Sequence, residues 1–239
     1  MKKIAAVVPA FNEEKAIAEV ITGIKSLERT ENLTIDVIVV NDCSTDKTAA
    51  IASCLDCVVL NLPVNLGIGG AVQTGFKYAY QRGDDIALQV DGDGQHPPEE
   101  IPKLLRALEG EGTDVVIGSR FLESGGYQSS FLRRVGIRYF MLLNELTARL
   151  RITDSTSGFR AINRRALRVV NDYYPDQYPE PEAIILYALS GLKIKETPVE
   201  MKERHGGRSS ISAIASIYYL FKVTFAMFFT YIRLRRRRK

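Results

Sequence analysis

Short β-branched apolar runs alternate with helix-type segments through the first two-thirds of this chain, and this alternation most constrains its fold. The strand-type runs lie at residues 4–8, 35–40, 58–60, 86–90 and 115–117. Segments with helical spacing are expected between them, at residues 14–27, from about 46, from 67 to 80 and at 99–108. Apolar runs linked by helices predict an α/β fold with a mainly parallel central sheet that is covered on both faces.

Polar segments follow these strands at the positions where a parallel sheet binds its ligands. In such sheets the ligands lie beyond the carboxyl ends of the strands. That rule selects residues 9–14, 41–46, 65–70, 91–96 and 118–121 before any motif is considered.

The acidic turn after the fourth strand carries the clearest chemistry. Residues 91–99 read Asp-Gly-Asp-Gly-Gln-His-Pro-Pro-Glu. Asp91 and Asp93 can bind one hard cation, because Mg²⁺ takes one or two protein carboxylates and completes its shell with phosphate oxygens and water. A nucleotide diphosphate leaving group needs such neutralisation when a glycosidic bond breaks. The alternative for this turn is an ordinary solvated acidic loop.

The basic excess of the chain is confined to its end. Residues 233–239 hold six of the 32 lysines and arginines and no acid, which leaves 26 basic and 28 acidic groups in the remainder. A body with a formal charge of −2 is not a nucleic-acid-binding body. Three cysteines and an amino end without a signal-peptide cleavage pattern favour a cytosolic location.

The last segment differs from the rest. Residues 211–232 contain one charge, Lys222, and a helix of that length spans about 33 Å, enough to cross a bilayer. A polar stripe favours instead a helix that lies in the membrane interface. The stripe comprises Ser212, Ser216, Tyr219, Lys222 and Thr230. A buried core helix is the third possibility. We therefore expect a catalytic domain at 1–210 and a membrane-associated helix with a basic tail at 211–239.

Several motifs together resemble one family. They are Pro9-Ala-Phe-Asn-Glu-Glu, Val40-Asn-Asp-Cys-Ser-Thr-Asp, Asn65-Leu-Gly-Ile-Gly-Gly-Ala, Asp91-Gly-Asp-Gly-Gln-His and Gly118-Ser-Arg-Phe. In order and spacing they resemble the family-two glycosyltransferases with the A-type (GT-A) fold. Residues 154–160 and 204–210 are similar to the dolichol-phosphate mannosyltransferase-like branch, which loads sugars onto polyprenyl phosphates.

The resemblance implies a role for each matching residue. The donor-binding set would be Pro9, Ala10, Phe11, Asn12, Glu13, Asp42, Asn65, Gly67, Gly70 and Asp91. Asp91 and Asp93, with Gln95 as a third candidate, would hold Mg²⁺ or Mn²⁺. The acceptor phosphate would meet Arg120, Arg134, Arg204 and Ser209, and the catalytic set would be Asp91, Asp93, Arg120 and Arg204. Helix capping is the alternative for Asn12 and Asp46, and a solvated surface charge is the alternative for each arginine.

The expected reaction follows from the acceptor. A phosphate monoester has its second pKa near 6, so a polyprenyl phosphate is already an anionic nucleophile at neutral pH and needs no general base. We expect inversion at the anomeric carbon, with a UDP-sugar favoured as donor, at the cytoplasmic face of the plasma membrane. Glu180 and Glu182 lie about where relatives that act on hydroxyls carry their base, so a sugar-hydroxyl acceptor stays an alternative.

Two further possibilities complete the sequence-based expectations. One is a non-catalytic membrane protein that binds nucleotide-sugars. The other concerns partners, because a small membrane protein or a second copy of the chain could pack against the terminal helix.

Overall fold

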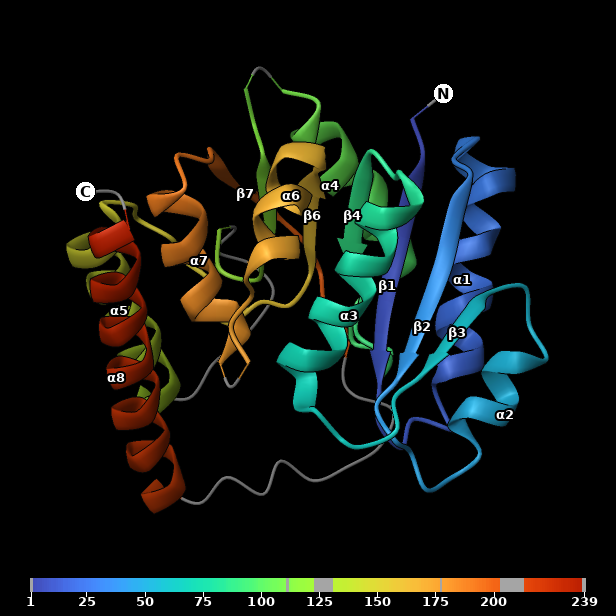
Figure 1. Cartoon of the computed structure of the whole chain (residues 1–239), viewed down its shortest axis with the longest axis horizontal. Helices are drawn as coiled ribbons and strands as arrows, with labels where there is room; N and C mark the ends of the chain where they lie inside the picture. Colours follow the sequence, from blue (N-terminus) through green and yellow to red (C-terminus); the bar gives the residue numbers. More distant parts are fainter. Residues whose placement is uncertain (1, 111, 123–130, 177, 203–212, 238–239) are drawn as a thin grey trace.

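A single seven-stranded sheet forms the centre of the protein, in the order β3-β2-β1-β4-β6-β5-β7 (Figure 1). The computed structural model describes residues 2–110, 112–122, 131–176, 178–202 and 213–237, without the side chains of 131–135, 137, 213–220 and 237. The strands are β1 Ile4–Ala10, β2 Ile35–Asn41, β3 Val58–Asn61, β4 Ile86–Gln89, β5 Val115–Ser119, β6 Arg160–Asn163 and β7 Ile194–Pro198. The helices are α1 Ile17–Glu31, α2 Thr48–Ser53, α3 Gly67–Arg82, η1 Pro98–Glu100, α4 Ile101–Leu108, α5 Phe131–Ala148, α6 Arg164–Asp172, α7 Pro179–Leu189 and α8 Ala213–Arg237.

Strand direction decides which loops can meet. β3, β2, β1 and β4 pair in parallel, and β5 and β7 are also parallel. β6 lies antiparallel to both β4 and β5, so it begins at the edge of the sheet where the other strands end. The predicted mainly parallel sheet is confirmed. The antiparallel strand β6 was not predicted, and it brings the segment before residue 160 to the same edge as the acidic turn.

Both faces of the sheet are covered, as the apolar runs predicted. Alternate residues of a strand point to opposite faces. On β1, Ala6 and Val8 belong to the apolar core shared with α1 and α4. Ala5 and Val7 belong to a second core on the other face, shared with α3, α6 and α7. The three layers place the strand ends and their loops along one edge.

The terminal helix α8 packs against the body, beside α7 and α5 (Figure 1). A small core of Phe140, Ile185, Val223 and Met227 joins the three helices. The helix does not stop at residue 232 as expected. It continues to Arg237, so Arg233, Arg235 and Arg236 lie on its last turns and not in a separate tail.

The expected polar stripe on this helix is not formed by the residues whose side chains are described. Lys222 is exposed, whereas Thr230 is only 5% exposed and faces the body. Ser212 and the side chains of Ser216 and Tyr219 lie outside the described residues. In the described ranges, every helix falls short of the combined length and apolar content that crossing a membrane requires.

Candidate active site

The acidic turn directly follows β4 and is held against the end of β1. Gly92 donates its backbone N–H to the carbonyl oxygen of Pro9 at 3.2 Å. The chain then bends through Gly94, whose φ of 78° lies in the left-handed region that glycine adopts without strain. The Asp91 side chain is 31% exposed and Asp93 is 6% exposed. Both carboxylates therefore share one turn at the edge where the parallel strands end.

His96 fixes the shape of this turn. Its ring stacks on Phe159 with centroids 4.8 Å apart, and it is only 3% exposed. Nδ1 accepts the backbone N–H of Asp91 at 3.0 Å, so the ring proton of the neutral form lies on Nε2. Nε2 is 3.7 Å from Asp91 Oδ2. No role was predicted for His96, and in the structure its ring is the group that holds the backbone of Asp91 in place.

The chemistry of the acidic turn fits a hard divalent cation. In the described ranges, no lysine or arginine forms an ion pair with Asp91, and Gln89 Nε2 approaches Oδ1 at 3.4 Å. Asp93 Oδ1 accepts the backbone N–H of Gln95 at 3.0 Å, which closes the turn. No group of three or more histidine, cysteine or acidic side chains is gathered for a metal within the part of the chain that is described. Two carboxylates with a shell completed by phosphate oxygens and water match the preference of Mg²⁺.

The first predicted donor loop follows β1. Pro9 and Ala10 are the buried last residues of that strand, and Phe11 is 46% exposed. Asn12 adopts a left-handed φ of 56°. Its Oδ1 accepts the backbone N–H of Thr45 at 2.8 Å.

Asn12 and Glu13 tie this loop to the one after β2. The backbone N–H of Asn12 donates to Ser44 Oγ at 3.0 Å, and that of Glu13 donates to Thr48 Oγ1 at 2.8 Å. Asn12 is therefore a bridge between two loops and does not cap α1, whose N-cap is Ala16. Asp46 accepts the backbone N–H groups of Thr48 and Glu14, but the N-cap position of α2 is Lys47, so Asp46 joins the two loops from one residue before the cap.

Asp42 organises the loop that leads into α3. Its carboxylate is buried and accepts the backbone N–H groups of Leu66 at 2.7 Å and Gly67 at 2.9 Å. Asn65 Nδ2 donates to the Asp42 carbonyl oxygen at 3.2 Å. We expected the Asp42 side chain to bind the base or ribose. Because both carboxylate oxygens hold backbone amides, that direct contact stays a prediction, and the observed role of Asp42 is to position the loop from 65 to 67. Gly70, half-buried in the first turn of α3, adds no polar side chain.

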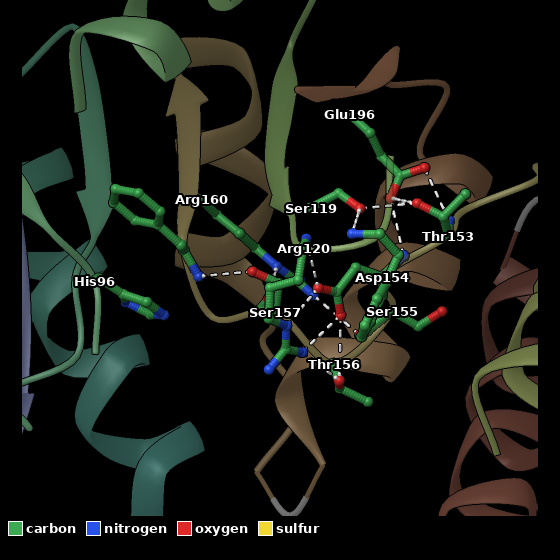
Figure 2. A network of polar contacts seen from close by, with 12 residues as sticks. His96, Ser119, Arg120, Thr153, Asp154, Ser155, Thr156, Ser157, Arg160 and Glu196 are labelled. Carbon is green, nitrogen blue, oxygen red and sulfur yellow. Dashed lines mark hydrogen bonds and ion pairs between the residues drawn. The ribbon is translucent and has the colours of Figure 1, made fainter. Parts of the chain in front are cut away.

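Arg120 follows β5, and a carboxylate holds its guanidinium (Figure 2). Nε and Nη2 donate to the two oxygens of Asp154, each at 2.7 Å, and the Arg120 backbone N–H donates to Oδ2 at 3.2 Å. Nη2 also donates to Thr156 Oγ1 at 3.0 Å. Arg120 was expected to present its guanidinium fork to a phosphate. In the structure the guanidinium instead binds the carboxylate of Asp154, which is 1% exposed. This contact forms because the antiparallel β6 brings residues 154–159 beside the end of β5.

Gly158 connects this segment to the acidic turn. A Cβ atom at this position would lie 2.7 Å from Gln89 Nε2 and 3.1 Å from each carboxylate oxygen of Asp91. Only glycine allows the backbone to approach the carboxylate so closely. The segment that binds Arg120 therefore also packs against a candidate metal ligand.

A buried arginine lies beneath the site, at the start of β6. Arg160 is 1% exposed and pairs across the sheet with Gln89. Its Nε donates to Ser157 O at 2.8 Å, and Nη2 donates to Glu180 O at 2.7 Å and to Ser155 O at 3.4 Å. Arg160 thus joins the segment before β6 to the first turn of α7.

Glu180 carries a perturbed carboxyl group next to this arginine. Burial raises the pKa of Glu180 from its ordinary value of 4.5 to about 6. The positive charge of Arg160 opposes this shift, and the negative charge of the nearby Asp91 adds to it. A carboxyl group whose pKa is raised on folding contributes stability that is present below about pH 4.5 and is lost as the pH rises through about 6.

This sign gives a testable pH dependence. In metal-free buffer, the melting temperature of the wild type should fall as the pH rises from 4.5 to above 6, and Glu180→Gln should flatten that fall. Differential scanning calorimetry across this range measures the effect. Glu99→Gln, which changes an exposed carboxylate, is the control and should follow the wild type. Parallel profiles for the wild type and Glu180→Gln would contradict the prediction.

Glu182 connects α7 to the terminal helix. It is 5% exposed and accepts the hydroxyl of Thr230 at 2.7 Å. Burial raises the pKa of Glu182, and the hydrogen bond from Thr230 opposes the shift. The side chain therefore faces α8, where it lies in the wall of a groove of about 550 Å³ whose aromatic lining is Tyr173, Tyr178, Phe221, Phe225 and Phe229.

Some of the predicted residues cannot be placed. Arg204, Ser209 and the side chain of Arg134 lie outside the described residues. Conversely, His96, Asp154, Arg160 and Glu196 belong to the site region and were given no role from the sequence. The motif at 154–160 contained two of them, but only the antiparallel pairing of β6 shows what they contact.

The comparisons with known proteins agree with this arrangement. The sequence profile described as Glycosyl transferase family 2 matches residues 5–170. A UDP-N-acetylglucosamine–dolichyl-phosphate N-acetylglucosaminyltransferase of Methanococcus voltae is 31% identical, over 83% of this chain and 85% of its own length. An undecaprenyl-phosphate mannosyltransferase of Micrococcus luteus is 29% identical, over 88% of both chains.

Solved structures show the same fold. Glucosyl-3-phosphoglycerate synthase from Mycobacterium tuberculosis, in complex with Mn²⁺, UDP and phosphoglyceric acid, superposes with a TM-score of 0.68 at 23% identity. The match covers 98% of this chain and 78% of that one.

Proposed function

The chain belongs to glycosyl transferase family 2, in the polyprenol-phosphate branch with the GT-A fold, and on this premise we propose that it is a metal-dependent, inverting enzyme that moves a sugar from a nucleotide-sugar to a polyprenyl phosphate. The observation that carries the proposal is the acidic turn, with Asp91 and Asp93 at the strand edge and His96 holding the backbone of Asp91. A UDP-sugar is the favoured donor and undecaprenyl phosphate the favoured acceptor.

The residues of the turn suit the departure of a diphosphate. Asp91 and Asp93 would hold Mg²⁺ or Mn²⁺, which when bound neutralises negative charge on the leaving group. In the displacement, an acceptor phosphate oxygen forms a bond to the anomeric carbon while the bond from that carbon to the diphosphate oxygen breaks. The leaving nucleoside diphosphate takes the bonding electron pair. Arg120, whose Nε and Nη2 are held by Asp154, would supply positive charge near the approaching phosphate.

The position of Glu182 favours the phosphate acceptor. A general base must reach the proton that it removes, to about 3 Å directly or through one water. Glu182 is buried and accepts a hydrogen bond from Thr230 on α8. A phosphate acceptor, ionised near pH 7, makes no demand for such a base.

Substitution of Glu182 separates the two acceptors. Glu182→Gln keeps an oxygen that can accept from Thr230, so we expect transfer to polyprenyl phosphate to stay within about tenfold of the wild type, less than the loss of one proton-transfer catalyst causes. Steady-state rates with both substrates measure this. A loss of several orders of magnitude in a variant with unchanged folding would contradict the phosphate-acceptor mechanism.

A second candidate function rests on Glu180. Its pKa of about 6 suits a general base at neutral pH, which a transferase acting on a sugar hydroxyl would require. In that case Glu180→Gln would abolish transfer to a saccharide acceptor, and polyprenyl phosphate would not be glycosylated.

One assay tests the main proposal. Purified protein is incubated with undecaprenyl phosphate in detergent or vesicles and with radiolabelled UDP-sugars and GDP-mannose, with Mg²⁺ or Mn²⁺ and with EDTA. We expect a labelled, lipid-extractable product with at least one donor and none with EDTA. Transfer to saccharides alone would support the second candidate. Nucleotide binding without any transfer would support a binding protein.

Location at a membrane surface is part of the proposal. α8 exposes Phe221, Phe225, Phe228 and Phe229, between 49% and 63% each, and the neighbouring α5 exposes Leu142 and Leu146. Arg235 and Arg236, both exposed, follow on the last turns of α8. Exposed aromatic side chains with nearby arginines are the features of a helix that lies in a membrane interface. The cytoplasmic face of the plasma membrane would supply the polyprenyl phosphate.

A vesicle-binding experiment tests this location. Removing one buried Phe from a membrane interface costs on the order of 1.5–3 kcal/mol, so Phe225→Ser with Phe229→Ser should weaken binding to anionic vesicles at least tenfold. Co-sedimentation measures the partition. Val64→Ser, an exposed apolar residue in the loop before α3, is the control and should bind like the wild type. Equal binding of the double variant and the wild type would remove α8 from the membrane contact and leave a protein partner or a second copy as its occupant.

A further inference from the structure

Glu196 stands on β7, at the edge of the sheet, where the sequence carries no recognised motif. β7 pairs in parallel with β5, with Glu196 opposite Ile117. The side chain is half-buried, and in the described ranges it forms no ion pair with a lysine, arginine or histidine. Its carboxylate acts instead as a hydrogen-bond acceptor.

The carboxylate of Glu196 accepts three hydrogen bonds from two consecutive residues (Figure 2). Oε2 accepts the backbone N–H of Thr153 at 2.8 Å. Oε1 accepts the Thr153 hydroxyl at 2.8 Å and the backbone N–H of Asp154 at 2.9 Å. Both ends of the carboxylate are therefore used to fix one turn of the chain.

That turn contacts both the side chain of Arg120 and the residue that precedes it. On one side, Asp154 binds the guanidinium through two bonds of 2.7 Å. On the other side, Thr153 Oγ1 is 2.8 Å from the hydroxyl of Ser119, the residue before Arg120. Glu196 thus reaches the side chain of Arg120 through Asp154 and its backbone through Thr153 and Ser119.

The geometry points to Glu196 as a positioning residue for Arg120, acting through Asp154. This inference rests on the proposed function, in which Arg120 meets the acceptor phosphate. Glu196 does not touch the substrate. It holds Asp154, which sets the direction in which the guanidinium presents its donors. A misplacement of about 1 Å in a group that positions a reactant can cost about 100-fold in rate.

Only a carboxylate satisfies the three donors. A glutamine at 196 has one acceptor oxygen and an amide NH₂ group, so at least one of the three donors would face another donor. We therefore expect Glu196→Gln to retain part of the network and Glu196→Ala to lose it. The rate of transfer at limiting acceptor should fall about 10- to 100-fold in Glu196→Ala and less in Glu196→Gln.

A double-mutant cycle tests the coupling. Transfer to undecaprenyl phosphate is measured for the wild type, Glu196→Ala, Arg120→Ala and the double variant, with UDP affinity measured for each by calorimetry. If Glu196 acts through Arg120, its substitution has no further effect once Arg120 is alanine, and the double variant matches Arg120→Ala within about twofold. UDP affinity should be unchanged by Glu196→Ala. Glu200→Ala, an exposed acid four residues along the same segment, is the control and should behave as the wild type.

The possible failures are distinguishable. Independent, multiplicative effects of the two substitutions would overturn the inference while the wild-type transfer upholds the proposed function. An inactive wild type counts against the proposed function and against this inference with it. If circular dichroism shows that Glu196→Ala does not fold, the same cycle is measured with Glu196→Gln. An effect of Glu196→Gln that persists in the Arg120→Ala background would overturn the inference.

Discussion

Replacing Asp93 by asparagine is expected to reduce sugar transfer about 1,000-fold. Loss of a cation that supplies about 4 kcal/mol of transition-state stabilisation corresponds to that factor, since about 1.4 kcal/mol is tenfold. Asparagine keeps an oxygen for the backbone N–H of Gln95, so the turn should retain its shape. The measurement is kcat/KM for the donor as a function of Mn²⁺ concentration, and Asp91→Asn should behave in the same way.

The control for these variants is Glu99→Gln, an exposed carboxylate just beyond the turn. It should keep the activity and the metal dependence of the wild type. Asp93→Asn at wild-type activity, with an unchanged Mn²⁺ requirement, would show that this carboxylate does not hold the metal. Activity of the wild type in EDTA would remove the metal from the mechanism altogether.

Replacing Arg160 by methionine is expected to produce the largest loss of stability. The substitution leaves the carbonyl oxygens of Ser157 and Glu180 without their donor and removes the cation near the half-buried Glu180 side chain. Removing one partner of a buried charged group costs about 3–5 kcal/mol. In a chain of this size that corresponds to a fall in melting temperature of about 6–20 °C.

Differential scanning calorimetry at pH 7 measures the loss. Arg29→Met, an exposed arginine in the last turn of α1, is the matched control and should change the melting temperature by less than about 2 °C, as surface substitutions do. An equally small change for Arg160→Met would contradict the prediction. It would mean that water replaces the hydrogen bonds of the guanidinium with little loss of stability. Among the described residues, no hydrogen bond satisfies the buried Nη1 atom of Arg160 or the buried hydroxyls of Tyr174 and Tyr187, and a bridging water would do so.

The first half of the sheet and its loops were predictable because their signals are local. Each strand from β1 to β5 is a short apolar run, and the acidic turn follows β4 directly. The parallel arrangement follows from the alternation with helices. These features require only neighbouring residues, and the positions of Asp91, Asp93 and Arg120 at strand ends agree with the prediction.

The rest depends on contacts between distant residues. β6 has four residues and begins with an arginine, so it has no strand signature, and its direction depends on pairing with β4 and β5. The link from Glu196 to Asp154 spans 42 residues and includes no motif. Likewise, nothing in the sequence near Thr230 shows that it turns inward to Glu182 rather than outward with Lys222.

The hydrogen bond between Glu182 and Thr230 also affects where the acidic turn would lie relative to a bilayer. Because α8 is fastened to α7 by this bond and by an apolar core, the height of the acidic turn above a bilayer would be set by a rigid frame and not by a tether. If the protein acts at a bilayer on a polyprenyl phosphate, as we propose, the phosphate headgroup would have to lie at a fixed level to react. Selection among lipid acceptors would then depend on the depth of the phosphate headgroup in the bilayer as well as on its chemistry.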